Sequence, residues 1–131
     1  MDPQRLQFWI DFIVDKARFP SPERLAAQFN AAQFSEFCDC GCNSFKVSVP
    51  ADSGIEPIAK PSAHSGAGAI FQSSFRLSPS GKSLEIVLFA DAPGNLAYVE
   101  IDCNANSEPV PESITVQDGP YHVHGESSLA P

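Results

Sequence analysis

Hydrophobic residues recur at helical spacing through the first part of the chain. Asp2 and Pro3 form a helix start signal, because aspartate caps a helix and proline suits its first turn. The apolar positions that follow lie three or four residues apart and predict an amphipathic helix: Leu6, Trp9, Ile10, Ile13, Val14 and Ala17. Phe8 and Phe12 add a second stripe, so we expect this helix to pack on two sides.

A second helix is predicted directly after the first. A phenylalanine–proline pair at 19–20 ends the first helix, and a serine–proline–glutamate run at 21–23 repeats the start signal. The helical spacing continues to about Phe34, with Leu25, Phe29 and Ala32 facing inward. These aromatic stripes predict a protein core and not a ligand pocket.

The pattern changes to strict alternation after residue 44. Residues 45–49, 71–77, 84–90 and 97–103 each alternate or run apolar and are separated by turn signals at 79–82 and 91–95, which predicts antiparallel strands. In the strand at 84–90, Val87 and Phe89 are apolar on the second face too, so we expect a central strand with both faces covered. Cys103 is predicted to face inward with the apolar set of its strand.

These elements predict a single α+β domain over residues 1–131, with two N-terminal helices packed on an antiparallel β-meander of four to six strands. A helical segment covers 1–35, the cysteine cluster 36–43, and the strands 44–103, with a flexible loop at 51–67. Residues 104–131 form a proline-rich acidic tail. Within this tail, residues 114–116 and 121–124 are candidates for short strands.

Charge is distributed unevenly along the chain. The net charge is −8, yet residues 1–82 hold all eight Lys and Arg residues together with eight acids. Residues 83–131 hold eight acids and no base, so the whole net charge lies in the C-terminal third. Such a field repels nucleic acid and anionic membranes and attracts a basic partner; simple solubility is the alternative explanation.

The sequence predicts a cytoplasmic protein without a membrane span. Asp11 and Asp15 interrupt the apolar residues of the first 19 positions, which therefore do not resemble a secretory signal. No apolar run approaches the roughly 20 residues needed to cross a bilayer. The cytosol keeps thiols reduced, so we expect free cysteines.

Cys38, Cys40 and Cys42 alternate around Gly41 and form the most distinctive cluster of the sequence. Thiolates are soft ligands that suit zinc, copper(I) or iron–sulfur centres, which makes a small zinc protein one hypothesis. The fourth ligand would be Cys103, His122 or His124, or a water in an open site. The sequence lacks the two-pair spacing that is typical of structural zinc sites.

Two other roles for the cysteines stay open. A disulfide between cysteines two apart closes a small, strained ring that is easily reduced, which would suit a thiol redox sensor. Alternatively, all three sulfurs line one face of a strand and only pack, because cysteine is among the most buried residue types. The absence of a Cys-x-x-Cys pair argues against thioredoxin-type chemistry.

Two stretches carry a family resemblance. Residues 36–45 hold the Cys-x-Cys-Gly-Cys cluster, and residues 87–101 hold an apolar strand, a turn and a second strand that leads to Pro109, Pro111 and Glu112. Together they resemble a family of small uncharacterised bacterial proteins with this cluster. The resemblance covers about half the chain and implies a bacterial, cytosolic, single-domain protein, but no activity. Cys103 is not part of the family pattern.

The function predicted from these observations is that of a non-catalytic acidic binding protein. The sequence has no phosphate-binding glycine loop, HExxH or GxSxG motif, so a conventional enzyme is the least favoured class. An inhibitor or immunity-type protein that docks a basic partner fits the charge distribution. The acidic residues expected to bind the partner are Asp91, Glu100, Asp102, Glu108, Glu112 and Asp118.

Overall fold

The fold was obtained as a computed structural model, which describes residues 1–37, 41–61, 68–126 and 129. Helix α1 spans Pro3–Lys16 and helix α2 spans Pro22–Ala31. Both have proline in the first turn, as the start signals predicted. At α1 the Asp2 side chain accepts a hydrogen bond from the Arg5 backbone N–H at 2.8 Å, which satisfies one of the unpaired donors of the first turn.

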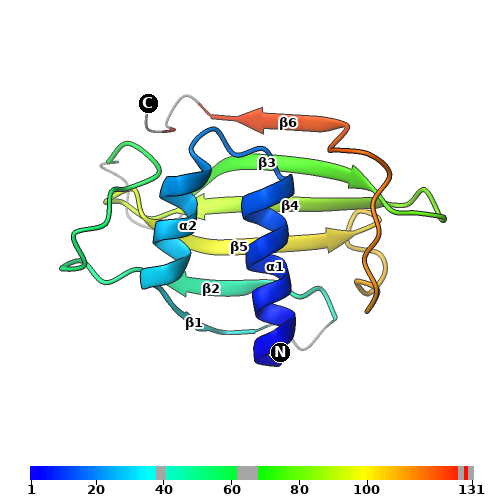
Figure 1. The fold of residues 1–131 in the computed structure, drawn as a ribbon, viewed down its shortest axis with the longest axis horizontal. Coiled ribbons are helices and arrows are strands. Elements are labelled where there is room, and N and C mark those ends of the chain that lie inside the picture. The colour runs from blue at the N-terminus through cyan, green and yellow to red at the C-terminus, as the bar shows by residue number, and fades with distance from the viewer. Residues whose placement is uncertain (38–40, 62–67, 127–128, 130–131) are drawn as a thin grey trace.

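Six strands form one antiparallel sheet in the order β1-β2-β5-β4-β3-β6 (Figure 1). Their bounds are β1 Gln33–Ser35, β2 Phe45–Ser48, β3 Gly68–Arg76, β4 Ser83–Ala90, β5 Leu96–Cys103 and β6 His122–Gly125. Strands β3, β4 and β5 follow one another as a meander, whereas β2 and β6 join its two sides from distant parts of the chain. The predicted α+β class, with two helices on an antiparallel meander, is confirmed.

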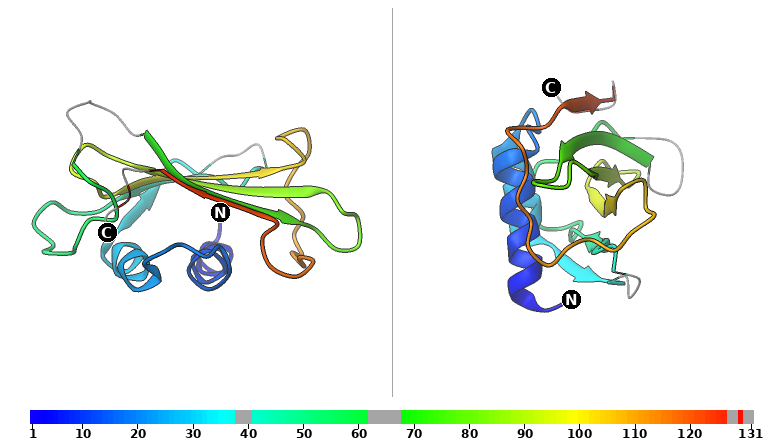
Figure 2. Two further views of the ribbon diagram at one scale, coloured as in Figure 1. Left: turned by 90° about the horizontal axis from the view of Figure 1, so that it is seen from above. Right: turned by 90° about the vertical axis from the view of Figure 1, so that its right-hand side faces the viewer.

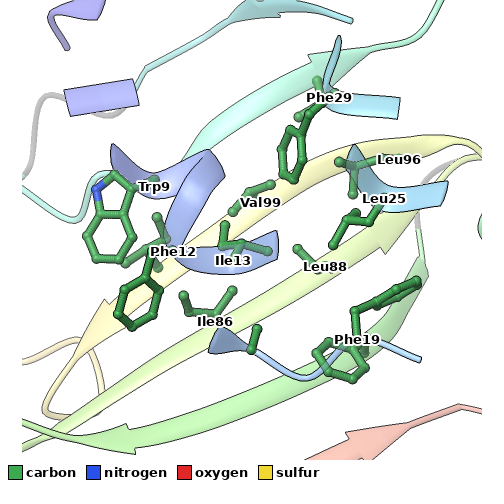
Figure 3. Packing of buried hydrophobic residues seen from close by; sticks show 14 of the residues in the cluster. Trp9, Phe12, Ile13, Phe19, Leu25, Phe29, Ile86, Leu88, Leu96 and Val99 are labelled. Carbon is green, nitrogen blue, oxygen red and sulfur yellow. The ribbon is translucent and has the colours of Figure 1, made fainter. Parts of the chain in front are cut away.

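Both helices lie on the same face of the sheet (Figure 2). The core fills the space between them and the strands, where Trp9, Phe12 and Ile13 of α1 and Leu25 and Phe29 of α2 are buried (Figure 3). The sheet supplies the alternate residues of its strands, including Cys103, which faces inward as predicted. The core therefore has one helical layer and one sheet layer.

The opposite face of the sheet has no covering helix or strand within the described ranges (Figure 2). The expectation that strand 84–90 is covered on both faces is therefore wrong. Strand β4 is central in the strand order, but only its alternate residues from Leu84 to Ala90 are buried. Val87 and Phe89 are half-buried on the open face. Apolar side chains on the second face of this strand do not signal a second layer here.

Two further expectations are corrected. Helix α2 ends at Ala31 and not near Phe34, because residues 33–35 form β1 and pair with β2, with Phe34 opposite Val47. Residues 114–116 form no strand, and Val116 makes a single bridge with Leu77. The candidate strand at 121–124 is confirmed as β6, one residue further on.

The loop that follows β2 is attached to the β4–β5 hairpin at Gly94. The Gly94 carbonyl accepts hydrogen bonds from the backbone N–H groups of Ile58 and Ala59 at 2.9 and 3.1 Å. Gly94 has φ +96°, and a Cβ there would lie 2.1 Å from the Ala59 carbonyl oxygen. Only glycine permits this approach.

Candidate functional site

The cysteine cluster lies only partly within the described residues. Cys38 and Cys40 are outside them, while Cys42 is buried just before β2. Gly41 has φ +87° and Asn43 has φ +64°, so the chain turns sharply on either side of Cys42. The Gly41 carbonyl accepts a hydrogen bond from the Val110 N–H at 2.8 Å, which joins this turn to the segment after β5.

Asn43 connects the cysteine turn to helix α1. Its Oδ1 atom accepts hydrogen bonds from Arg5 Nε and from Trp9 Nε1, both at 2.8 Å, and its Nδ2 donates to the Gly41 carbonyl at 3.2 Å. The Trp9 indole is fully buried, so this is the acceptor that its N–H needs. The turn is thus fixed by a partly buried polar contact that sequence periodicity does not reveal.

A hollow on the described surface lies beside this contact. It has a volume of about 530 Å³ and is lined mainly by the start of α1, Asn43 and Glu112. Arg5 looks like an anion-binding group there, but its guanidinium donates to the backbone carbonyls of Pro111 and Glu112 as well as to Asn43. Burial lowers the pKa of Arg5, with Glu112 opposing this. Arg5 therefore holds the chain together at this point.

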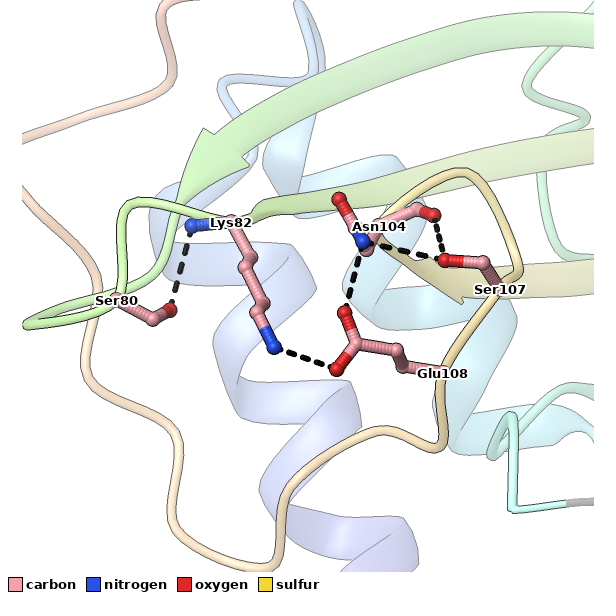
Figure 4. A network of polar contacts seen from close by, with 5 residues as sticks. All are labelled: Ser80, Lys82, Asn104, Ser107 and Glu108. Atoms are coloured by element: carbon pink, nitrogen blue, oxygen red, sulfur yellow. Dashed lines mark hydrogen bonds and ion pairs between the residues drawn. The ribbon is translucent and has the colours of Figure 1, made fainter.

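Cys103 ends β5 next to a polar network. Glu108 pairs with Lys82 and also accepts a hydrogen bond from Asn104 Nδ2 at 2.7 Å (Figure 4). Burial raises the pKa of the Cys103 thiol, and the Glu108 charge raises it further while Lys82 opposes. A buried thiol with a raised pKa is a poor nucleophile at neutral pH, which argues against a redox-sensor role for Cys103.

The other proposed metal ligands are not brought together in the described part of the chain. Cys42 and Glu108 line one shallow hollow of about 250 Å³, and Cys103 forms a backbone bridge with Glu108. His122 and His124 lie on β6, at the far side of the sheet from β2 and roughly 19 Å away across four strand spacings. Within the described residues, no three His, Cys, Asp or Glu side chains are grouped as a metal site.

The open face of the sheet carries a compact group of carboxylates. Glu85 on β4 pairs directly across the strands with Asp102 on β5, and Glu100 lies two residues along β5 on the same side. We call Glu85, Glu100 and Asp102 the acidic face. Among the described residues, none of the three forms an ion pair with a basic side chain.

Clustering of the three charged carboxylates on the acidic face is electrostatically unfavourable in the isolated protein. Partial burial raises the pKa of Glu100, and the neighbouring charges of Asp102 and Glu85 raise it further. The pKa of Asp102 is raised in the same way, first by burial and then by Glu85. Like charges directly opposite on adjacent strands destabilise a sheet. The three side chains are thus partly desolvated and mutually repelling.

Apolar residues continue the same surface. Val87 lies opposite Glu100, and one row further on Phe89 lies opposite Tyr98. The Phe89 and Tyr98 rings are in edge-to-face contact, with centroids 5.9 Å apart. Across β4 and β5 the open face therefore has an aromatic row, a mixed row and an acidic row, spaced about 7 Å apart. The exposed Lys46 of β2 lies opposite Tyr98 at the end of the aromatic row.

The other acidic residues expected to bind a partner are dispersed. Asp91 accepts hydrogen bonds from the Gly94 and Asn95 N–H groups and so closes the β4–β5 turn. Glu108 is paired with Lys82 at the opposite end of the sheet. Glu112 and Asp118 are exposed on the segment between β5 and β6. Only Glu100 and Asp102 of the predicted set share a surface.

Glu85 is not among the acidic residues predicted to bind a partner. It alternates with the buried residues of β4, so its direction could be inferred, but its position opposite Asp102 depends on the register of β4 with β5. The apolar character of Phe89 predicts a covered face, whereas the structure leaves this side chain half-buried on the open face. The register of the β4–β5 hairpin places Glu85 and Phe89 on the same surface as their partners on β5.

The comparisons with known proteins give no relative. No protein family, curated protein or solved structure matches this chain. Among the described residues there is also no helix with the length and apolar character needed to span a bilayer.

Proposed function

We propose that this protein is a non-catalytic binding protein that docks a basic protein partner on the open face of its sheet. The observation that carries the proposal is the acidic face, three clustered carboxylates without a basic partner among the described residues. A lysine or arginine from a partner would relieve their mutual repulsion and favour their charged forms. Opposite charge on the partner would also speed encounter and exclude acidic competitors.

The apolar rows complete the surface. Protein interfaces are enriched in aromatic residues at their centre and polar residues at the rim. Phe89, Tyr98 and Val87 supply half-buried apolar contact area next to the carboxylates. A cation that binds beside these side chains would be partly desolvated, which strengthens its attraction to the acidic face. An inhibitor or immunity-type protein that blocks a basic target has these requirements.

Charge neutralisation tests the proposal. The acidic-face variant combines Glu85→Gln, Glu100→Gln and Asp102→Asn. The control variant removes three exposed carboxylates from elsewhere through Glu23→Gln, Asp52→Asn and Glu56→Gln. The wild type and both variants are immobilised and exposed to a cell extract. A protein that the wild type retains is then purified, and its affinity for each of the three proteins is measured by calorimetric titration.

A basic protein that binds the wild type and the control variant equally, but the acidic-face variant at least about tenfold more weakly, would support the proposal. A purified partner that binds all three proteins with the same affinity would refute the role of the acidic face.

Zinc binding by the cysteine cluster is a separate hypothesis. The test compares the zinc content per chain of the wild type with that of the Cys42→Ser variant. About one zinc per chain that the substitution removes would support a metal centre. Metal-free protein with reactive thiols would exclude it.

A further inference from the structure

A second surface lies between the two helices, on the side of the sheet away from the acidic face (Figure 2). It is a groove of about 440 Å³ lined by residues of α1, α2 and β1. The apolar lining comes from Leu6, Ile10 and Val14 on one side and from Phe29 and Phe34 on the other.

The α1 side of the groove is an apolar stripe that the core leaves partly uncovered. Leu6, Ile10 and Val14 are four residues apart, so they lie above one another along one side of the helix. All three are half-buried, whereas the core-facing Trp9 and Ile13 are fully buried. The stripe therefore has apolar area available for contact with another segment.

Acidic side chains border the stripe. Asp11 and Asp15 are exposed and line the same groove, and no lysine or arginine lines it. The nearby Lys16 lies instead over the Phe12 ring, with its Nζ 5.6 Å from the ring centroid. An apolar groove whose charged lining residues are both acidic matches a segment that is apolar on one side and basic along its edge.

We propose that the groove between α1 and α2 binds an amphipathic helical segment of a partner protein, with an apolar face and lysine or arginine along its flank. The stripe from Leu6 to Val14 is about 12 Å long, which corresponds to some two turns of a bound helix. A second copy of this chain is a poor occupant, because its net charge of −8 would repel Asp11 and Asp15. The inference is independent of the acidic face.

The test uses a defined synthetic peptide of about twelve residues, with leucine at helical spacing on one face and lysine on its flanks. The peptide is titrated into isotope-labelled protein while backbone amide shifts are recorded, and its affinity is measured by calorimetry. We expect shifts in α1, α2 and β1. A peptide with glutamate in place of lysine should bind at least about tenfold more weakly, because it repels the border.

Variants separate the apolar and the charged contributions. Ile10→Ser should weaken binding by about tenfold, since it removes the centre of the stripe. Asp11→Asn with Asp15→Asn should weaken it by about three- to tenfold and reduce its salt dependence, and this exposed pair leaves the core intact. Glu23→Gln with Asp52→Asn removes the same charge from exposed positions outside the groove and should have no effect.

Several outcomes would overturn the inference. These are equal binding of the lysine and glutamate peptides, unchanged affinity in the Asp11 and Asp15 double variant, and shifts confined to β4 and β5. Sedimentation that shows a dimer dispersed by Ile10→Ser would identify a second copy as the occupant instead. The acidic-face variant should bind the peptide normally, so failure here and failure of the proposed function are distinguishable.

Discussion

Removing the charge of Glu85 should stabilise the isolated protein. Glu85 lies directly opposite Asp102, and its charge contributes to the raised pKa values of Asp102 and Glu100. Glu85→Gln keeps the size and polarity of the side chain while it removes the repulsion. If the acidic face exists for a basic partner, the free protein retains an arrangement that costs stability.

The expected gain is modest. Directly opposite side chains place two carboxylates about 6 Å apart, which corresponds to roughly 0.7 kcal/mol of repulsion in water. Partial burial increases this value and salt decreases it, so we expect a gain of about 0.5–1 kcal/mol at low ionic strength. For a chain of 131 residues, the melting temperature should rise by about 2–4 °C.

The pH dependence provides the sharper test. Glu100 and Asp102 have raised pKa values in the folded state, so the wild type loses stability as pH rises from their unfolded values through their folded values. The advantage of Glu85→Gln should therefore be largest at neutral pH and nearly disappear below about pH 4. Thermal unfolding followed by circular dichroism at several pH and salt values measures it, with Asp52→Asn as control. A gain that is independent of pH and salt would refute the electrostatic explanation.

Three further substitutions test the packing around the sites, each by chemical denaturation. Asn43→Ala should cost about 2–4 kcal/mol, because the buried Trp9 indole and Arg5 lose their acceptor, whereas the exposed Asn30→Ala should cost little; an effect as small as that of Asn30→Ala would contradict this role. Ser73→Ala should leave stability within about 0.5 kcal/mol or increase it, since the buried Oγ has no hydrogen-bond partner among the described residues, and a large loss would reveal one. Gly94→Ala should cost more than about 1 kcal/mol because of its positive φ and its contact with the 58–59 segment, and unchanged stability would show that the loop can move away.

The sequence predicted correctly those elements whose ends depend on residues within the element itself. The cap at Asp2 fixed the start of α1, and alternation fixed the inward set of β5, including Cys103. The end of α2 could not be read in this way. Phe34 fits the helical spacing, but its backbone pairs with β2, and that pairing depends on a strand eleven residues further on.

The open face could not be predicted from the sequence, because it too depends on contacts between segments that are distant in the chain. Apolar residues at Val87 and Phe89 are typical of a strand with two covered sides, and only the tertiary arrangement shows that both helices occupy one face. Likewise, the charge count located the acidity in the C-terminal third. The grouping of Glu85 with Asp102 required the register of the β4–β5 hairpin.

The proposal that the acidic face docks a basic partner is tested most directly by locating where a cation-rich ligand binds. A lysine- and arginine-rich peptide without apolar residues is titrated into isotope-labelled protein at low salt, and the amide shift changes are mapped. If the acidic face is the docking site, the largest amide shift changes should occur around Glu85, Glu100 and Asp102. These changes should disappear in the acidic-face variant. Changes of similar size around Asp91, Glu112 and Asp118, unaffected by that variant, would contradict the claim.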